Sequence, residues 1–504
     1  MKTTKYIIIY LLAIGVFVSG CKKFEDFQID PNKPSTGAPY LLLPYLISDV
    51  FYSGDPTAWG AAAQQLFYAE RRESPQYWGW NADGFGWYAD IRQAQKMIEE
   101  ATKTNAMEYI PIAKFFTQLS FYEQTRKVGD IPYSQAMKAE SDNNVTPKYD
   151  SQKSVFIGIL NELEKINEEL IPLEGKTISG DLLYDGDLKK WRKLINSYRL
   201  KILMDLSMKE SDAELRIKEQ FKQIFTNPSK YPCFEDNDDM PRFKFFDQEN
   251  NRYPTYNRVT TKFQQKLTST VIDHLKLHFD PRIFSYAEPA WPKDYEDWTE
   301  AQKASYRADF KSYKGVDPGI EHGEGTQQNV SNLHWRYYER PTGEDYVKYS
   351  FAELNFIIAE AALRNWIQAD ANSYFRKGIA ASMEFYDTPS NQIDAYLARP
   401  ENNLSAELKS AIEQVNMEKY IAFFMNSSWE AYFNQRRMAA HRLGPDQDGV
   451  PHYKVGPSHY VTAAPIRWEY PRAELTDNEA NVKEAIQQQF NGENLITGKM
   501  WLIK

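Results

Sequence analysis

Apolar side chains that recur every three or four residues constrain the fold of this chain more than any other feature. Residues 151–170 show the pattern most clearly, with Asp150 or Ser151 as the N-cap and an apolar stripe of Val155, Ile159, Leu163, Ile166 and Leu170. This spacing places the stripe on one face of an α-helix. The same rhythm recurs in 187–208 and 349–365, and further helices are expected at 106–127, 370–386 and 405–439.

Several of these segments come in pairs joined by short polar turns, which predicts stacked antiparallel helix hairpins. No repeat of fixed period is visible in the sequence, so any tetratricopeptide-like character is degenerate. Trp191 lies on the apolar stripe of 187–208 and is expected in the core rather than in a ligand site. The sequence therefore predicts a mostly α fold of degenerate tetratricopeptide-like helix hairpins, with long irregular loops and little β structure.

The N-terminus has the layout of a secretory signal. Lys2 and Lys5 precede an apolar run at 6–18, and the small residues Ser19 and Gly20 lead directly into Cys21. The run is too short for a membrane-spanning helix, which needs about 20 residues. We expect residues 1–20 to be a lipoprotein signal peptide, with cleavage before Cys21 and lipid on its thiol; the alternative is an ordinary signal peptide with a coincidental cysteine. Residues 21–39 are then a lipidated tether, and 40–504 a single helical binding domain.

Charge and cysteine usage exclude several classes of protein. The chain has a formal net charge of −9, and removal of Lys2 and Lys5 with the signal peptide makes the remainder −11. An acidic body argues against nucleic acid as a partner. With Cys21 lipidated, Cys233 has no intramolecular partner for a disulfide. We expect Cys233 to be a buried small hydrophobe, with a catalytic thiol as the alternative.

Motifs for metal binding and catalysis are weak. His274 and His278 are spaced to share one helix face, but the position after the first His is Leu275, where a zinc protease needs a glutamate. A surface histidine pair is the expected reading. The acidic run 235–239 could ligate calcium, yet it lacks EF-hand spacing and is expected to be a solvated turn. We predict no metal and no cofactor.

Aromatic residues in loop-like sequence are the strongest pointer to function. The chain is 14% aromatic, with 33 Tyr and 12 Trp, and two segments rich in aromatics lack a helical stripe, 71–90 and 285–345. Sugars bind by laying a C–H face on an aromatic ring while amides, carboxylates and arginines bond their hydroxyls. The predicted platforms are Trp78, Trp80, Trp291 and Trp335, and the predicted hydrogen-bonding partners are Asn81, Asp83 and Arg336. The alternative is that the tryptophans pack the loops onto the body.

The order of short motifs along nearly the whole chain resembles the SusD/RagB family of lipoproteins. The resemblance is carried by Asp30-Pro31-Asn32-Lys33-Pro34, Tyr40-Leu41-Leu42-Leu43-Pro44, Gly129-Asp130-Ile131-Pro132-Tyr133, Tyr149-Asp150-Ser151-Gln152, Asp187 to Leu200, Phe351-Ala352-Glu353-Leu354, Gly378-Ile379-Ala380-Ala381-Ser382, Glu430-Ala431-Tyr432-Phe433, Pro465-Ile466-Arg467 and Tyr470-Pro471. Each motif is weak alone, but their order and spacing are specific. Glu353, Glu360, Arg436 and Arg467 are expected to be paired charges that fix helix against helix.

The resemblance implies a function as well as a fold. Family members are non-enzymatic outer-membrane lipoproteins that capture glycan fragments, or less often peptides, and deliver them to a SusC-like TonB-dependent transporter. Glu25 and Asp26 loosely match the family's surface-export signal, which implies a position facing the cell exterior. The expected partners are this transporter, an oligosaccharide or polysaccharide ligand, and the membrane through the lipid anchor. The alternatives are a peptide-binding uptake lipoprotein, a surface glycoside hydrolase with two carboxylates, and a purely structural transporter subunit.

Overall fold

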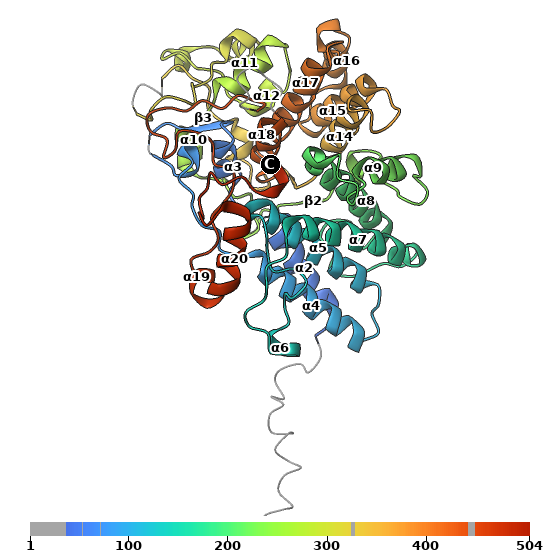
Figure 1. The fold of residues 1–504 in the computed structure, drawn as a ribbon. Helices are drawn as coiled ribbons and strands as arrows, with labels where there is room; N and C mark the ends of the chain where they lie inside the picture. The colour runs from blue at the N-terminus through green and yellow to red at the C-terminus, as the bar shows by residue number, and fades with distance from the viewer. Residues whose placement is uncertain (1–36, 53, 71, 324–327, 442–448) are drawn as a thin grey trace, which may run out of the picture.

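The structure is a computed structural model that describes residues 37–52, 54–70, 72–323, 328–441 and 449–504. The predicted signal peptide, the lipidated Cys21 and the tether as far as residue 36 lie outside the described residues. The first described helix, α2 (Pro39–Phe51), begins with proline at its first position. In Figure 1 it lies in the lower part of the molecule beside α4 and α5.

Stacked helices build this lower part. α4 (Trp87–Lys103) and α5 (Tyr109–Val128) form a hairpin, and α7 (Gln152–Leu170) and α8 (Leu188–Asp205) pack next to it in order. The predicted N-cap is confirmed, because the Ser151 side chain accepts a hydrogen bond from the backbone N–H of Ser154. Asp187 caps α8 in the same way. The predicted helices at 106–127, 151–170 and 187–208 are therefore confirmed.

A second set of hairpins lies in the right and upper part of Figure 1. α14 (Phe351–Leu363) packs against α15 (Ala371–Phe385), with α16 (Ser390–Leu397), α17 (Leu408–Ala422) and α18 (Glu430–His441) following. Gly378 allows the close approach of α14 and α15, because a Cβ there would lie 2.6 Å from the Phe356 ring. The single helix expected at 405–439 is interrupted. Met425, Ser427 and Ser428 have positive φ, and the N–H of Ser427 bonds the carbonyl of Val347 instead of continuing the helix.

The remaining elements are short, and the described residues hold little β structure. β1 (Leu66–Tyr68) pairs antiparallel with β3 (Gln265–Leu267), and β2 (Arg242–Phe243) with β4 (Tyr346–Val347). Short helices complete the chain: α3 (Pro56–Ala62), α6 (Ala139–Asp142), α9 (Ile217–Thr226), α10 (Val259–Gln264), α11 (Ser269–Leu277), α12 (Ile283–Tyr286), α13 (Glu300–Arg307), α19 (Glu474–Asp477) and α20 (Glu479–Phe490). The mostly α prediction is confirmed.

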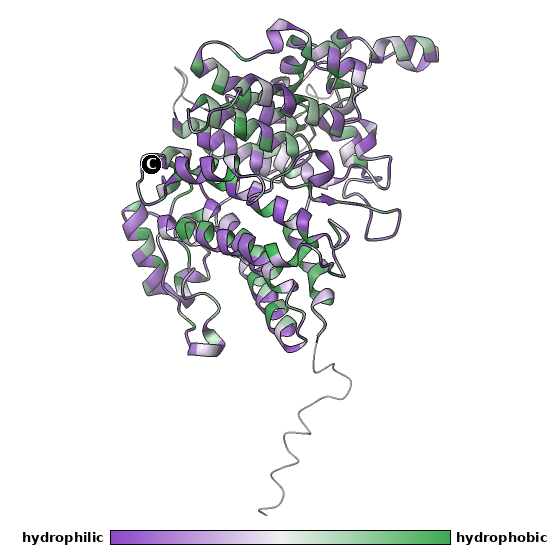
Figure 2. Cartoon of the chain, turned by 90° about the vertical axis from the view of Figure 1, so that its right-hand side faces the viewer, coloured by the Kyte–Doolittle hydropathy of each residue, from purple (hydrophilic) through white to green (hydrophobic). Residues whose placement is uncertain are grey.

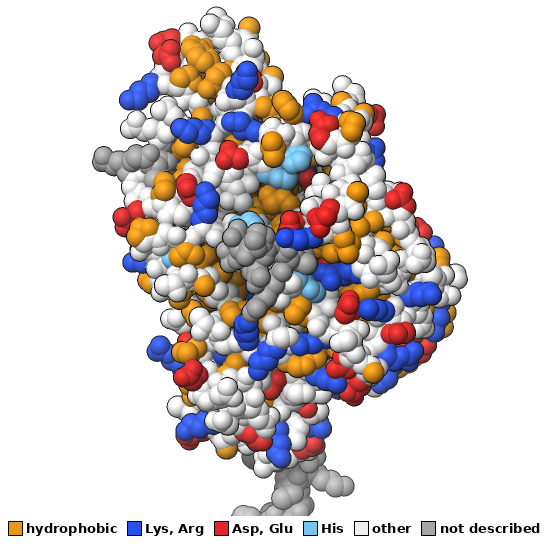
Figure 3. Space-filling view, turned by 45° about the horizontal axis from the view of Figure 1, so that its top comes forward, with side chains coloured by type: hydrophobic (Ala, Val, Ile, Leu, Met, Phe, Trp, Pro, Cys, Tyr) orange, Lys and Arg blue, Asp and Glu red, His pale blue; other side chains and the backbone are white. Residues whose placement is uncertain are grey.

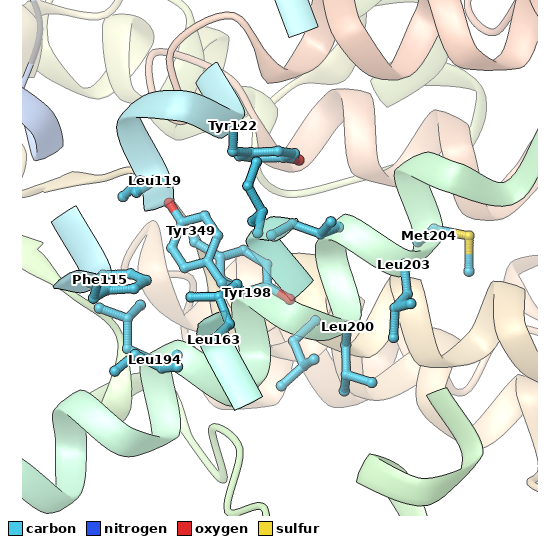
Figure 4. Close-up of a cluster of buried hydrophobic side chains, with 14 of the residues drawn as sticks. Phe115, Leu119, Tyr122, Leu163, Leu194, Tyr198, Leu200, Leu203, Met204 and Tyr349 are labelled. Atoms are coloured by element: carbon cyan, nitrogen blue, oxygen red, sulfur yellow. The ribbon is translucent and has the colours of Figure 1, made fainter. Parts of the chain in front are cut away.

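The largest core lies between the stacked helices. Figure 4 shows part of it, in which side chains from α5, α7, α8 and the segment before α14 meet: Phe115, Leu119, Tyr122, Leu163, Leu194, Tyr198, Leu200, Leu203, Met204 and Tyr349. Figure 2 shows hydrophobic and hydrophilic residues alternating along the helices, as expected of helices with one buried face. Trp191 is fully buried against Phe51, Phe115 and Phe116, which confirms its predicted place in the core.

Buried ion pairs join helices that are far apart in the sequence. Arg126 of α5 pairs with Glu430 of α18, and Lys201 of α8 pairs with both Glu430 and Glu353 of α14. Glu360 of α14 pairs with Arg437 of α18. The predicted pairing of Glu353 and Glu360 with opposite charges is confirmed.

For Arg436 and Arg467 the prediction of charge pairing is wrong within the described part of the chain, where neither forms an ion pair with a carboxylate. Arg436 Nη1 donates to the carbonyl oxygens of Arg126 and Ile466, at 3.0 and 2.8 Å. Arg467 donates to the carbonyl of Leu495 and the side chain of Asn494. Both guanidinium groups thus fasten irregular C-terminal segments through neutral acceptors, which sequence spacing does not reveal.

Candidate functional site

The first aromatic segment, 72–86, folds tightly onto the body around Trp78. The Trp78 ring is 0% exposed, and its Nε1 donates to the carbonyl of Ala62 at 2.9 Å. The ring meets His459 edge-on, with centroids 4.6 Å apart. Trp78 therefore presents no open ring face to a sugar, and its contacts are those of the packing alternative.

Trp80 belongs to a cluster of four aromatic side chains. It stacks on Trp468 with centroids 5.3 Å apart, and Trp429 and Tyr432 meet it edge-on. Trp80 belongs to the first aromatic segment, and Trp468 lies in the C-terminal region. Tyr432 is on α18, and Trp429 immediately precedes this helix. Their contacts hold the segment in place.

The two polar residues predicted beside Trp80 have different surroundings. Asp83 accepts hydrogen bonds from Gln124 and Lys127 of α5, at 2.9 and 3.1 Å, and one from the backbone of Phe85. Its carboxylate is thus used within the protein. Asn81 is exposed, and its carbonyl accepts from the backbone N–H of Glu469 at 2.9 Å. The Asn81 side chain is open to a ligand.

The second aromatic segment presents partly exposed rings. Trp291 stacks on Tyr295 with centroids 4.9 Å apart, and Tyr306 lies beside it at 5.6 Å. Trp298 meets Tyr306 edge-on. A capping box between Thr299 and the third residue of α13 fixes the start of the helix that carries Tyr306. All four rings are partly exposed.

Glu288 lies between Trp335 and Trp291. The backbone N–H of Trp335 donates to Glu288 Oε1 at 3.4 Å, and the Trp291 side chain lies close enough to this carboxylate to lower its pKa. The structure therefore gathers two of the predicted platforms, and we call Trp291, Tyr295, Trp298, Tyr306 and Trp335 the aromatic platform. The other three members of the platform, Tyr295, Trp298 and Tyr306, were not predicted as ligand contacts from the sequence. Their position in the same aromatic-rich block was the available signal.

Cations accompany the aromatic platform. The guanidinium of Arg307 lies 5.0 Å from the centroid of the Trp291 ring, and that of Arg340 lies 4.6 Å from Trp335. Burial and the neighbouring arginines lower the pKa of His334 to about 3, so this imidazole is neutral at pH 7. Burial raises the pKa of Glu288. The platform thus offers partly exposed rings and two guanidinium groups, which are groups that recognise a polyhydroxylated ligand, while the buried Glu288 carboxylate holds the segment together.

Arg336 is committed to contacts within the protein. Its Nη2 donates to Glu344 at 3.0 Å and to Asp387 at 2.8 Å, and Nη1 donates to the carbonyl of Tyr386. The side chain is 5% exposed. Arg336 therefore fastens the second aromatic segment to the end of α15 and leaves ligand contacts to Arg307 and Arg340.

The other candidate residues have structural surroundings. His274 and His278 pack ring to ring at 4.6 Å and are half buried, not free on the surface as expected, because Glu418 and Asn402 lie against them. Lys193 bonds both Glu235 and Asp239 of the acidic run. Within the described part of the chain, no group of three or more His, Cys, Asp or Glu is arranged to hold a metal ion.

Cys233 is packed against the main core. Burial raises the pKa of its thiol to about 12, so the group stays protonated at neutral pH. A protonated thiol is a poor nucleophile, which favours the small-hydrophobe interpretation over the catalytic one.

The upper face of the molecule carries hydrophobic side chains among charged ones. Figure 3 shows a compact hydrophobic group at the upper edge of this face, with Lys, Arg, Asp and Glu around it. In the described ranges, no helix is both long enough and apolar enough to span a bilayer.

Comparison with known proteins decides the family. A family model described as "Starch-binding associating with outer membrane" (SusD-like) matches residues 48–471. The chain belongs to the SusD-like family. Its homologues are described as outer-membrane proteins that bind nutrients or carbohydrates, and the degenerate tetratricopeptide-like architecture expected from the sequence is the family's fold. A search of the curated proteins gives no match.

Solved SusD-like structures cover nearly the whole chain. A SusD homolog from Bacteroides fragilis is 31% identical, with a TM-score of 0.83 over 93% of this chain and 100% of its own. An outer-membrane protein from Bacteroides vulgatus with a suggested role in nutrient binding is 33% identical, with a TM-score of 0.79 and the same coverage. A chitin-binding protein is 25% identical, with a TM-score of 0.72 over 92% of this chain and 100% of its own. The helical scaffold is thus shared along the full described length.

Proposed function

We propose that this SusD-like chain is a non-catalytic, lipid-anchored outer-membrane protein that binds glycan fragments at the aromatic platform and delivers them to a SusC-like TonB-dependent transporter. The observation that carries the proposal is the gathering of Trp291 and Trp335 around Glu288, with Arg307 and Arg340 over their rings. Partly exposed aromatic rings with guanidinium groups beside them suit a sugar chain. The chitin-binding relative supports a glycan as the ligand class.

Binding at the aromatic platform is tested with the soluble body, residues 22–504, on affinity gels that contain single polysaccharides. Trp291→Ala and Trp335→Ala are expected to weaken retention on the bound polysaccharide about 10-fold or more, as for loss of a central aromatic contact. Phe246→Ala is the matched control, because this ring is 57% exposed and lies outside the platform. Unchanged retention in both tryptophan variants would move the site elsewhere.

Two further measurements separate the alternatives. Incubation of the body with the bound oligosaccharide is expected to yield no new reducing ends, whereas a glycoside hydrolase would generate them. Loss of glycan uptake in cells without the protein, together with measurable glycan binding by the purified body, supports delivery. Loss of uptake with no binding of glycan or peptide would instead indicate a purely structural subunit.

Anchoring and delivery are tested on the full chain. We propose that Cys21 carries the lipid and that residues 22–39 let the body move against its transporter. Cys21→Ser is expected to release the protein from outer-membrane fractions without changing glycan affinity. The exterior position predicts that protease added to intact cells removes the wild-type body, and resistance of that body would place it on the inner face.

A further inference from the structure

Two arginines beside the aromatic platform have no partner for their guanidinium groups. The guanidinium of Arg307 lies 5.0 Å from the centroid of the Trp291 ring, and that of Arg340 lies 4.6 Å from the centroid of the Trp335 ring. Both arginines are exposed. Within the described residues, neither guanidinium forms an ion pair or donates a hydrogen bond. The N–H donors of both groups therefore remain open to a ligand.

This lack of partners distinguishes the two arginines from the rest. Every other arginine in the described ranges that lies over an aromatic ring donates from its guanidinium to an acceptor of the protein. Arg72, over Tyr460, donates to the carbonyl of Ser458, and Arg252 donates to Asp247. Unpaired guanidinium groups over rings are therefore a property of the platform and not of surface arginines in general.

The charges of both arginines act on the same imidazole. Burial lowers the pKa of His334, and the charges of Arg336, Arg340 and Arg307 lower it further, to about 3. Arg336 is paired with carboxylates, whereas Arg340 and Arg307 are not. A neutral imidazole adds no charge of its own. The positive charge around His334 therefore comes from the two unpaired arginines.

The carboxylates near these arginines are engaged elsewhere. Glu288 is 9% exposed and accepts a hydrogen bond from a backbone N–H. Burial raises the pKa of Glu288, although this hydrogen bond and the charge of Arg307 oppose the rise. Glu339 lies 3.5 Å from Lys262. In the described part of the chain, neither carboxylate forms an ion pair with Arg307 or Arg340.

We propose that the aromatic platform is selective for an anionic glycan, whose carboxylate or sulfate group binds Arg307 and Arg340 while its sugar rings contact Trp291 and Trp335. This inference rests on the proposed glycan-binding function and adds the charge of the ligand. A guanidinium group binds an oxyanion through parallel hydrogen bonds that the opposite charges strengthen. Because the chain as a whole has a net charge of −9, its general surface does not attract anions, and selectivity has to come from a local positive site.

The first test compares two matched pairs of polymers on affinity gels with the body, residues 22–504. Polygalacturonate carries carboxylates and its methyl ester is the neutral partner, whereas dextran sulfate carries sulfates and dextran is the neutral partner. At least one acidic polymer is expected to retain the body about 10-fold more strongly than its neutral partner, because the neutral polymer lacks the charge-assisted hydrogen bonds. Preference for polygalacturonate identifies a carboxylated sugar, and preference for dextran sulfate identifies a sulfated one.

Arg307→Gln and Arg340→Gln locate the contact. Glutamine removes the charge, so each variant is expected to weaken retention on the preferred acidic polymer about 10-fold. Both arginines are exposed and have no partner among the described residues, so the circular dichroism spectrum should stay unchanged. Arg72→Gln is the matched control, because it removes an exposed arginine that lies 4.0 Å from the centroid of the Tyr460 ring, outside the platform. General attraction of the polymer to basic residues would weaken retention equally in all three variants.

Three results would overturn the proposal. The first is that the body is retained by neutral polysaccharides alone, and the second is that each acidic polymer retains it no better than its neutral partner. The third is that Arg307→Gln and Arg340→Gln weaken retention no more than Arg72→Gln. A glycan still binds in each of these cases, so the proposed glycan-binding function stands. Absence of retention on every polysaccharide, acidic or neutral, would instead refute that function, and the preference for anions with it.

Discussion

Replacing Glu430 with glutamine is the sharpest test of how the helix pairs are held together. The carboxylate of Glu430 on α18 accepts from Arg126 at 2.6 and 3.0 Å and from Lys201 at 2.9 Å, and its side chain is 6% exposed. Breaking a buried ion pair by removing one partner costs about 3–5 kcal/mol. Glutamine keeps one acceptor oxygen, and Arg126 keeps Glu123 and Asp205. We therefore expect the lower end, a loss of about 3 kcal/mol in the free energy of unfolding.

The loss of stability in Glu430→Gln should be larger at neutral pH than at acidic pH. Burial alone raises the pKa of Glu430, but Arg126 and Lys201 together hold this pKa well below its ordinary value. A depressed pKa contributes stability above the unfolded pKa, which is about 4.3 for glutamate, and this contribution is lost as pH falls below it. The difference between wild type and Glu430→Gln should be fully present at pH 7 and shrink as pH falls below about 4.3.

The assay is urea unfolding followed by circular dichroism at pH 7, with Glu479→Gln as the matched control. Glu479 forms an exposed pair with Lys483 on α20, its side chain being 59% exposed. The control should lose no more than about 0.5 kcal/mol. A Glu430→Gln midpoint equal to that of the control would refute the reasoning that this ion pair joins α18 to α5 and α8.

Three more outcomes follow from single contacts. Trp78→Phe should lower the free energy of unfolding by about 1–3 kcal/mol, because it loses the bond to the Ala62 carbonyl and ring volume, and glycan affinity in calorimetry should stay unchanged. The Cys233 thiol, with a pKa of about 12, should resist a thiol reagent at pH 8 and react after unfolding; rapid reaction in the native state would contradict its burial. Burial raises the pKa of Asp130 to about 7, so the native state binds a proton there more tightly than the unfolded chain, and this contribution to stability is lost as pH rises from about 4 to 7. Asp130→Asn should therefore flatten the fall in stability over that range, as measured by urea midpoints at pH 4 and 7.

Local sequence patterns were sufficient for most of the helices. The apolar spacing in 151–170 and the cap at Ser151 both act within one or two turns of chain, and α7 begins and ends where they indicate. The pattern failed across 405–439, because the break between α17 and α18 depends on a backbone bond from Ser427 to Val347, 80 residues away. A helical stripe cannot report such a distant partner.

The ligand site was only partly predictable, because the exposure of an aromatic ring also depends on distant segments of the chain. Aromatic residues in irregular sequence drew attention to both segments, but composition does not tell an exposed ring from a packed one. Trp78 is fully buried against His459, and Trp80 is partly buried and stacks on Trp468. Trp291 and Trp335 keep partly exposed rings near Glu288.

The sequence by itself determined the secondary structure class, the order of the helix pairs and the resemblance to the SusD/RagB family, because these depend on short-range spacing and on ordered motifs. Only the tertiary structure decided which aromatic rings are exposed and which charges are paired. The physical reason is that exposure and pairing are properties of contacts between segments hundreds of residues apart, as between Arg126 and Glu430.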